Sequence, residues 1–252
     1  MSRLWFRFSL LDPTKLIERD LAVLAESSRY ADLQFSKIER YIGSRVLELG
    51  AGIGTHTQRL VARQPELVIA VEQERRFCDE ITRRAGSGVR VLCLDLAHLA
   101  TAASELRRDR LDTIIALNVI EHVENDLACL AMAADLLVAG GHIIILAPAH
   151  PVLYAKLDRL YGHYRRYTRR MLLSYADHLG LQLIENTYFN MMGALGWLLL
   201  AKIGRATGLW REGMNLFDHM LPIQQRLERM LPVVPFGLGI LGVFKRNQSV
   251  PT

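Results

Sequence analysis

A glycine-rich turn with a carboxylate just before it is the part of this chain whose residue types and spacing could do chemistry. The apolar residues around Glu48 have the pattern of a buried strand, and Gly50, Gly52 and Gly54 follow at alternate positions. Glycine tolerates positive φ and, without a Cβ, lets a ligand lie against the backbone. Thr55 then opens a polar helix start. The pattern predicts a strand, turn and helix that bind a nucleoside-containing cofactor.

The spacing of these glycines indicates which cofactor. A dinucleotide fingerprint needs a small residue where Thr55 stands, which argues against an NAD-dependent oxidoreductase but leaves it open as an alternative. The segment instead resembles motif I of the class I S-adenosylmethionine-dependent methyltransferases. The resemblance implies S-adenosylmethionine as cofactor and S-adenosylhomocysteine as product. It places these residues at the cofactor: Glu48, Gly50, Ala51, Gly52, Gly54 and Thr55.

Carboxylates also end the next two predicted strands. Glu72, at the end of the second, is positioned to accept hydrogen bonds from both ribose hydroxyls. The resemblance implies that Asp95, after the third, hydrogen-bonds the adenine amino group. Their neighbours Gln73 and Leu96 are expected to line the same part of the cofactor site.

The segment from Asn118 to His122 resembles the motif that follows strand four in this family. Asn118 and His122 are therefore expected beside the methionine end of the cofactor, although Glu121 and His122 could equally be helix-capping or surface residues. One branch of the family has a divalent-metal site of the form E-x-x-E-H. Asn118 stands where that motif has its first glutamate, so no metal is expected.

A loop rich in histidine, tyrosine and arginine, residues 149–168, follows the fifth predicted strand and is expected to act as a lid. It resembles the P-A-H-P and G-H-Y-R-R-Y segments of a bacterial subset of these enzymes. The expected substrate contacts in it are His150, Tyr154, His163, Arg166 and Tyr167. His163, Tyr154 and Tyr167 are the candidate catalytic groups, with His163 as base if the acceptor must lose a proton. The alternative is a lid held together by stacked aromatic rings, with its arginines in water.

Strand and helix patterns alternate along the chain, which predicts a single domain over residues 1–252 with a parallel sheet. The expected fold is α/β: a Rossmann-like, seven-stranded, mostly parallel sheet with helices on both faces and an antiparallel last strand. Strands are predicted at 45–49, 67–72, 89–94, 113–117, 142–147, 181–189 and 239–245. A helical segment (1–44, helical from about 14 to 42) precedes the cofactor-binding core at 45–148. The helix that contains Leu127 and Leu137 is predicted to end at Gly140 and Gly141.

Residues 190–236 are predicted to form a helical cap inserted between the last two strands, on the substrate side. Its apolar run 191–201, which includes Trp197 as a further substrate contact, is too short to span a bilayer. The run suits a helix buried against the domain. The alternative is a wall for an apolar or lipid-bearing acceptor, in peripheral contact with the inner membrane.

Composition narrows the remaining function classes. The formal net charge is +5, but no continuous basic stripe with stacking aromatics is present, so a nucleic-acid partner is not expected. Three widely spaced cysteines indicate reduced thiols in the cytoplasm. The resemblance implies methyl transfer to a small-molecule or lipid- or glycan-linked acceptor, with O-methylation favoured over N or C. A non-catalytic cofactor-binding protein is the other alternative, and the sequence leaves the acceptor and the oligomeric state open.

Overall fold

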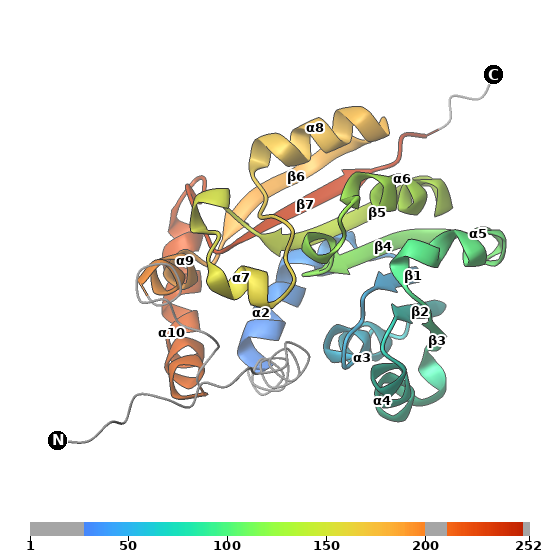
Figure 1. Cartoon of the computed structure of the whole chain (residues 1–252), viewed down its shortest axis with the longest axis horizontal. Coiled ribbons are helices and arrows are strands. Elements are labelled where there is room, and N and C mark those ends of the chain that lie inside the picture. Colours follow the sequence, from blue (N-terminus) through green and yellow to red (C-terminus); the bar gives the residue numbers. More distant parts are fainter. Residues whose placement is uncertain (1–27, 200–210, 249–252) are drawn as a thin grey trace.

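The computed structural model describes residues 28–199 and 211–248 (Figure 1). Helix α2 spans Ser28–Ile38 and continues into the 3-10 turn η1, Glu39–Tyr41. The remainder of the predicted N-terminal segment, 1–27, lies outside the described residues, as do residues 200–210 of the predicted cap.

Strands and helices alternate as the sequence predicts. The strands are β1 Arg45–Leu49, β2 Leu67–Glu72, β3 Arg90–Cys93, β4 Leu111–Leu117, β5 Leu137–Pro148, β6 Gln182–Phe189 and β7 Gly239–Lys245. The helices that follow α2 are α3 Thr55–Ala62, α4 Arg75–Ala85, α5 Leu99–Arg108, α6 Asp126–Leu136, α7 Lys156–Leu160, α8 Arg169–Leu179, α9 Met191–Trp197 and α10 Arg211–Met230. Short 3-10 turns join them: η2 Gly86–Gly88, η3 Leu96–His98, η4 Ile120–His122 and η5 Pro151–Leu153.

All seven strands form one sheet in the order β3-β2-β1-β4-β5-β7-β6. Strands β1 to β5 pair in parallel, and β7 runs antiparallel to both of its neighbours. The predicted fold class, including the antiparallel last strand, is confirmed. Because β1 to β5 are parallel, the loops after their carboxyl ends meet at one edge of the sheet, where ligands bind in open α/β folds.

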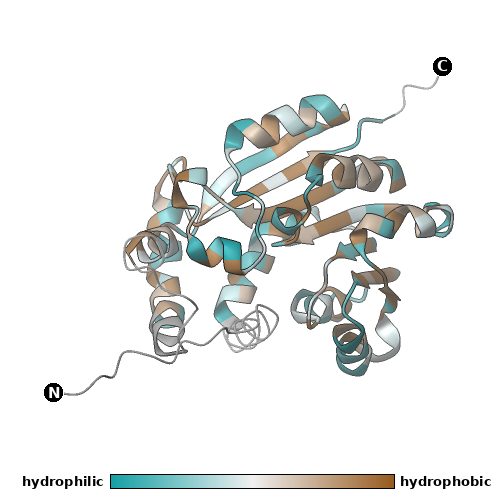
Figure 2. Ribbon diagram, in the orientation of Figure 1, coloured by the Kyte–Doolittle hydropathy of each residue, from teal (hydrophilic) through white to brown (hydrophobic). Residues whose placement is uncertain are grey.

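Apolar residues fill both faces of the sheet, which accounts for the brown strands in Figure 2. Helices α5, α6 and α8 cover one face, through buried residues such as Leu106, Leu130 and Leu172. Helices α2, α3 and α4 cover the other, through Ile38, Leu60 and Ile81. The result is a three-layer sandwich with the core at the sheet.

One boundary prediction is wrong. The helix predicted to end at Gly140 and Gly141 ends at Leu136, and both glycines lie inside β5. The register of β5 on β4 shifts here, since Leu137 pairs with Leu111 but His142 pairs with Thr113. A Cβ on Gly141 would lie 2.8 Å from the Asp112 carbonyl oxygen. The glycines mark a bulge with close backbone approach, a use of glycine that resembles a helix stop in sequence.

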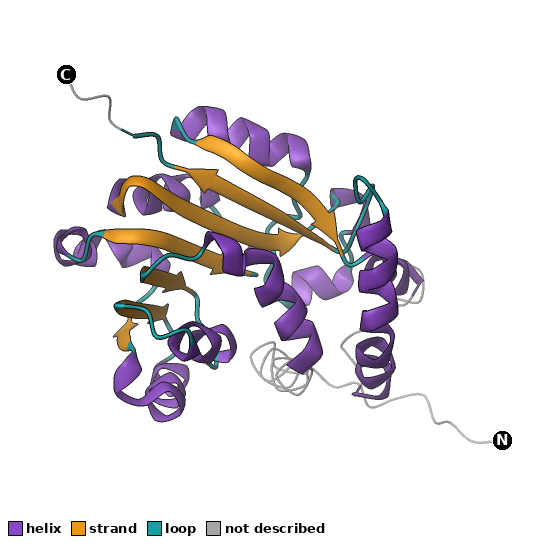
Figure 3. Ribbon diagram, turned by 180° about the vertical axis from the view of Figure 1, so that it is seen from behind, coloured by secondary structure: helices purple, strands orange, loops and turns teal. Residues whose placement is uncertain are grey.

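The segment between β6 and β7 holds α9 and α10, which gather with α7 and α2 at one end of the sheet (Figures 1 and 3). None of the helices in the described ranges is long and apolar enough to cross a bilayer.

Candidate functional site

The turn after β1 has the backbone that its glycines were expected to provide. Gly50, Gly52 and Gly54 all have positive φ, at 63°, 56° and 81°. A Cβ on Gly50 would lie 2.6 Å from a methyl group of Val119, so this glycine is also required by the close approach of the loop after β4. The turn is held to β2 by the Ala51 amide, which donates to the Val71 carbonyl over 3.0 Å.

Gly52 faces open space, where a Cβ would meet nothing within 4 Å. Its amide donates to Oε2 of Glu72, while Oε1 accepts from the amides of Gln73 and Glu74. These bonds fix the carboxylate beside the open glycine. A carboxylate oxygen has further acceptor capacity, so Glu72 can still accept hydrogen bonds from ribose hydroxyls. The residues of the turn therefore fit a nucleoside-containing cofactor.

The other residues predicted at the cofactor follow successive strands at the same edge. Gln73, Asp95 and Asn118 are exposed there, and Leu96 is half-buried. Asp95 caps η3 by accepting from the Ala97 amide over 2.8 Å, which leaves its second oxygen available. Their contacts with the cofactor stay predictions.

Glu48 is buried beneath the turn. The Thr57 hydroxyl donates to its Oε2 over 2.5 Å, and burial raises the pKa of Glu48 to about 8. Its carboxyl is therefore mainly protonated at neutral pH. A positively charged group of a ligand placed beside it would favour the ionised form.

The lid begins and ends beside β5. The His150 amide donates to the Tyr167 carbonyl, and the Tyr167 amide donates to the Pro148 carbonyl. Residues 149–167 therefore form a closed loop. Its centre is Asp158, whose carboxylate accepts from Arg166, from His163 and from the Ala155 amide over 2.8 to 2.9 Å. Burial alone would raise the pKa of Asp158, but the hydrogen bond from His163 and the Arg166 guanidinium outweigh it and hold that pKa below its usual range.

The Asp158 carboxylate fixes the tautomer of His163. An ionised carboxylate only accepts, so Nδ1 of His163 donates to it, and in the neutral imidazole Nε2 is then the nitrogen that carries the lone pair. The Tyr154 hydroxyl donates to the His163 carbonyl over 2.6 Å and fixes the backbone as well. A histidine oriented by a buried carboxylate, with an acceptor nitrogen on the other side of the ring, has the arrangement of a general base.

His163 also faces the loop after β4. Its ring lies 4.7 Å from that of His122, and ligand atoms of Glu121, His122 and His163 lie within 4.8 Å of one another. One oxygen of the buried Glu121 has no hydrogen-bond partner among the described residues. Two imidazoles and a carboxylate suit a divalent transition metal, so this trio could hold one. No metal was expected from the sequence, because that expectation considered only the segment from Asn118 to His122. His163, the third member of the trio, is distant along the chain.

Tyr167 was predicted as a substrate and catalytic residue, and the structure places it in the core instead. It is fully buried, and its hydroxyl donates to Asp126 over 2.7 Å. Asp126 also accepts from Tyr175 and Arg165. Sequence reasoning missed Asp126, because its partners lie 39 to 49 residues away and no local pattern marks it.

Arg166 and Trp197, which are also predicted to contact substrate, make contacts that hold the lid together in this structure. The Arg166 guanidinium is buried against Asp158 and lies 4.5 Å from the centre of the Trp197 ring. The Trp197 indole donates to the Leu153 carbonyl over 3.0 Å. Helix α9 is thus joined to the lid. His150 packs against Tyr188, with ring centres 4.3 Å apart and the rings tilted by 34°, and the φ of His150 is positive at 61°.

Comparison with known proteins agrees with this geometry. Residues 47–143 match a family model described as a methyltransferase domain. No curated protein matches the chain in sequence. Solved structures share its fold. A methyltransferase dependent on S-adenosylmethionine from Archaeoglobus fulgidus has a TM-score of 0.57 and 15% identity, over 86% of this chain and 94% of that one.

The N-methyltransferase NodS from Bradyrhizobium japonicum, solved with S-adenosylhomocysteine, has a TM-score of 0.53 and 15% identity, over 88% and 87% of the two chains. The [4+2]-cyclase SpnF has a TM-score of 0.56 and 13% identity, over 88% and 82%. The fold is that of solved methyltransferases, and residues 47–143 match a methyltransferase domain. The shared fold is one that S-adenosylmethionine-dependent methyltransferases use.

Proposed function

We propose that this enzyme transfers the methyl group of S-adenosylmethionine to a hydroxyl of a small-molecule or lipid- or glycan-linked acceptor. The observation that supports a hydroxyl acceptor is the His163–Asp158 pair, with 2.9 Å between Nδ1 and Oδ1. A hydroxyl must lose its proton as it is methylated, whereas a neutral amine already carries the lone pair that attacks and needs no base for that step. A lid that holds an oriented histidine supplies that base.

The cofactor supplies an electrophilic methyl group on a sulfonium. The residues of the chain then have two tasks, which are to hold the acceptor in line and to take its proton. Positioning provides most of the rate. In the proposed step the acceptor oxygen forms the bond to the methyl carbon, and the electrons of the breaking C–S bond return to sulfur. The hydroxyl proton passes to Nε2 of His163, whose positive charge the Asp158 carboxylate stabilises.

Two rival functions are separated by a titration followed by a turnover assay. S-adenosylhomocysteine should bind with measurable heat and NADH should not; the reverse result would indicate an NAD-dependent oxidoreductase. The SpnF neighbour carries the name of a cyclase on the same fold, so binding alone does not establish transfer. Incubation with methyl-labelled S-adenosylmethionine and fractionated cell extract should label an acceptor, and a cofactor-binding protein without activity would label none.

The location of the acceptor forms a separate part of the proposal. Leu195, Leu198 and Leu199 on and just after α9 are exposed, whereas Trp197 of the same helix packs on the lid. These leucines would contact a membrane that carries a lipid-linked acceptor. Sedimentation with anionic vesicles should fall for the Leu195→Glu, Leu199→Glu double variant and persist for Leu173→Glu, an equally exposed leucine on α8. Equal sedimentation of all three proteins would remove the membrane contact.

A further inference from the structure

Two thiols lie beside the strand ends where the nucleoside part of the cofactor is expected. Cys78 is on α4, and Cys93 is the last residue of β3. The Cys93 side chain is exposed, whereas Cys78 is buried, with an exposed fraction of 4%. Both are free thiols, and the third cysteine, Cys129, is buried on α6 at the other face of the sheet. The proposed methyl transfer uses none of the three.

The backbone of β2 and β3 brings Cys78 and Cys93 together. The two strands pair in parallel, with Glu72 opposite Cys93. The Cys78 thiol turns back from α4 and donates to the Glu72 carbonyl, with 3.3 Å between Sγ and O. The Cys93 thiol donates to the next carbonyl, that of Gln73, over 3.9 Å. The two sulfur atoms therefore contact consecutive carbonyl groups, and the two side chains also interact directly.

Burial and exposure determine which thiol reacts first. Burial raises the pKa of Cys78 to about 12, so this sulfur is protonated and shielded at neutral pH. The exposed Cys93 is the sulfur that an oxidant reaches. A sulfenic acid formed on Cys93 would stand next to a second thiol. This is the arrangement of a reactive cysteine with its resolving partner.

The chemistry balances with a peroxide as the oxidant. The Cys93 sulfur attacks one peroxide oxygen and the O–O bond breaks, which leaves a sulfenic acid and one water. The Cys78 sulfur then attacks the Cys93 sulfur, the S–O bond breaks, and the leaving hydroxide takes the Cys78 proton to form a second water. Each sulfur loses one electron, and the peroxide gains two. Because the thiols are already adjacent, the second step is intramolecular.

A disulfide at this place would disturb the residue predicted to bind the ribose. The Glu72 carboxylate accepts from the amides of Gln73 and Glu74, so its position depends on the backbone that follows β2. The carbonyls of Glu72 and Gln73 accept from the two thiols, and both bonds are lost once the sulfurs have no hydrogen to donate. The new bridge would also tie α4 to the end of β3, two residues before Asp95.

We propose that Cys78 and Cys93 form a site of oxidative modification, which closes as a disulfide and weakens binding of the nucleoside part of S-adenosylmethionine. The proposal rests on the cofactor of the function proposed above. By linkage, bound cofactor should in turn disfavour the disulfide. A dithiol reductant restores both thiols, so the modification is reversible.

The test treats the full chain with hydrogen peroxide and measures S-adenosylhomocysteine binding by calorimetry before and after. Mass spectrometry of a digest without reduction should find a peptide in which Cys78 and Cys93 are linked. The dissociation constant should rise about fivefold or more, the usual size of coupling between sites, and should return after dithiothreitol. S-adenosylhomocysteine present during oxidation should lower the yield of the linked peptide.

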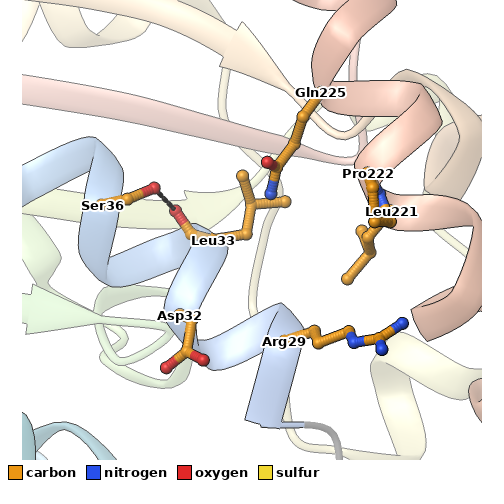
Figure 4. A pocket seen from close by; sticks show the side chains of 7 residues that line it. All are labelled: Arg29, Asp32, Leu33, Ser36, Leu221, Pro222 and Gln225. Carbon is orange, nitrogen blue, oxygen red and sulfur yellow. Dashed lines mark hydrogen bonds between the residues drawn. The ribbon is translucent and has the colours of Figure 1, made fainter.

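Two variants are matched controls. Cys93→Ser removes the exposed thiol, and its affinity should be equal before and after peroxide. Adding Ser36→Cys to this variant restores an exposed thiol in the depression between α2 and α10, away from α4 and β3 (Figures 1 and 4). The Ser36 hydroxyl donates to the Leu33 carbonyl of its own helix, so the change is local. Peroxide should oxidise this thiol without linking it to Cys78 and without changing the affinity.

Oxidised wild type without the linked peptide, or with it and an unchanged dissociation constant, would overturn the proposal. An equal loss of affinity in Cys93→Ser would assign the effect to other oxidised side chains and overturn it as well. If the reduced wild type did not bind S-adenosylhomocysteine, the proposed function would fail, and the effect on the cofactor with it. The linked peptide is measured by mass alone, so the two failures are distinguishable.

Discussion

The carboxylate of Glu72 accepts a hydrogen bond from the backbone amide of Gly52, with 2.8 Å between Oε2 and N. This bond joins the end of β2 to the turn after β1 and places the charge beside the open glycine. Glu72→Ala should weaken S-adenosylhomocysteine binding by about 1.5 to 3 kcal/mol, because hydrogen bonds to a charged group are lost. Calorimetry measures the change. Glu74→Ala, an exposed neighbour, should keep wild-type affinity, and an unchanged dissociation constant for Glu72→Ala would remove Glu72 from the site.

A second prediction concerns the open glycine. Gly52→Val places a branched side chain into the space over the turn, where nothing of the chain obstructs it. The positive φ of 56° costs roughly 1 to 2 kcal/mol of stability, so the fold should persist. Cofactor affinity should fall at least about tenfold. Gly180→Val has a similar φ of 62° at the end of α8 and should bind normally; equal affinity in both variants would show that the turn does not hold the cofactor.

A third prediction tests His163 as the base. His163→Asn should lower kcat by roughly 10² to 10⁴ with the labelled acceptor, because proton transfer by a positioned base contributes about that factor. Cofactor affinity should not change. His178→Asn, an exposed histidine on α8, is the control. A wild-type kcat in His163→Asn would restrict the His163–Asp158 pair to holding the lid.

Removal of metal separates the two uses of the Glu121, His122 and His163 trio. If His163 acts as a free base, dialysis against a chelator should leave turnover unchanged. Turnover that disappears on dialysis and returns with Mn²⁺ or Co²⁺ would assign the trio to a metal instead. Metal analysis of the purified protein supplies an independent measurement.

Glu48 should make stability depend on pH. Burial raises its folded pKa to about 8, above the ordinary value of 4.5, so the folded state binds the extra proton between these values. The contribution of Glu48 to the free energy of unfolding is therefore fully present below about pH 4.5, and it is lost as the pH rises toward 8. Urea unfolding of Glu48→Gln should show a smaller loss between pH 5 and pH 8 than the wild type. Glu66→Gln changes a surface carboxylate and should show the same pH dependence of unfolding free energy as the wild type. If Glu48→Gln showed that same dependence, Glu48 would not be the group that binds the extra proton.

The sequence by itself determined the sheet and the glycine-rich turn that fits the cofactor. Strand periodicity and the glycine spacing are local, and a parallel sheet brings successive strand ends to one edge, so Glu72, Asp95 and Asn118 could be placed together without a structure. The bulge at Gly140 and Gly141 escaped this reasoning. Glycine at a helix stop and glycine at a close backbone approach look alike in sequence.

Only the tertiary structure decided what the lid and cap residues do. Tyr167 and Arg166 carry chemistry-bearing side chains, yet both are buried on partners, Asp126 and Asp158, that no periodicity reveals. The same long-range packing aligned His163 with Asp158 and turned it toward the loop after β4, and it enclosed Gln224 without partners among the described residues. Side-chain roles of this kind depend on contacts between distant segments, which exist only once the helices have packed on the sheet.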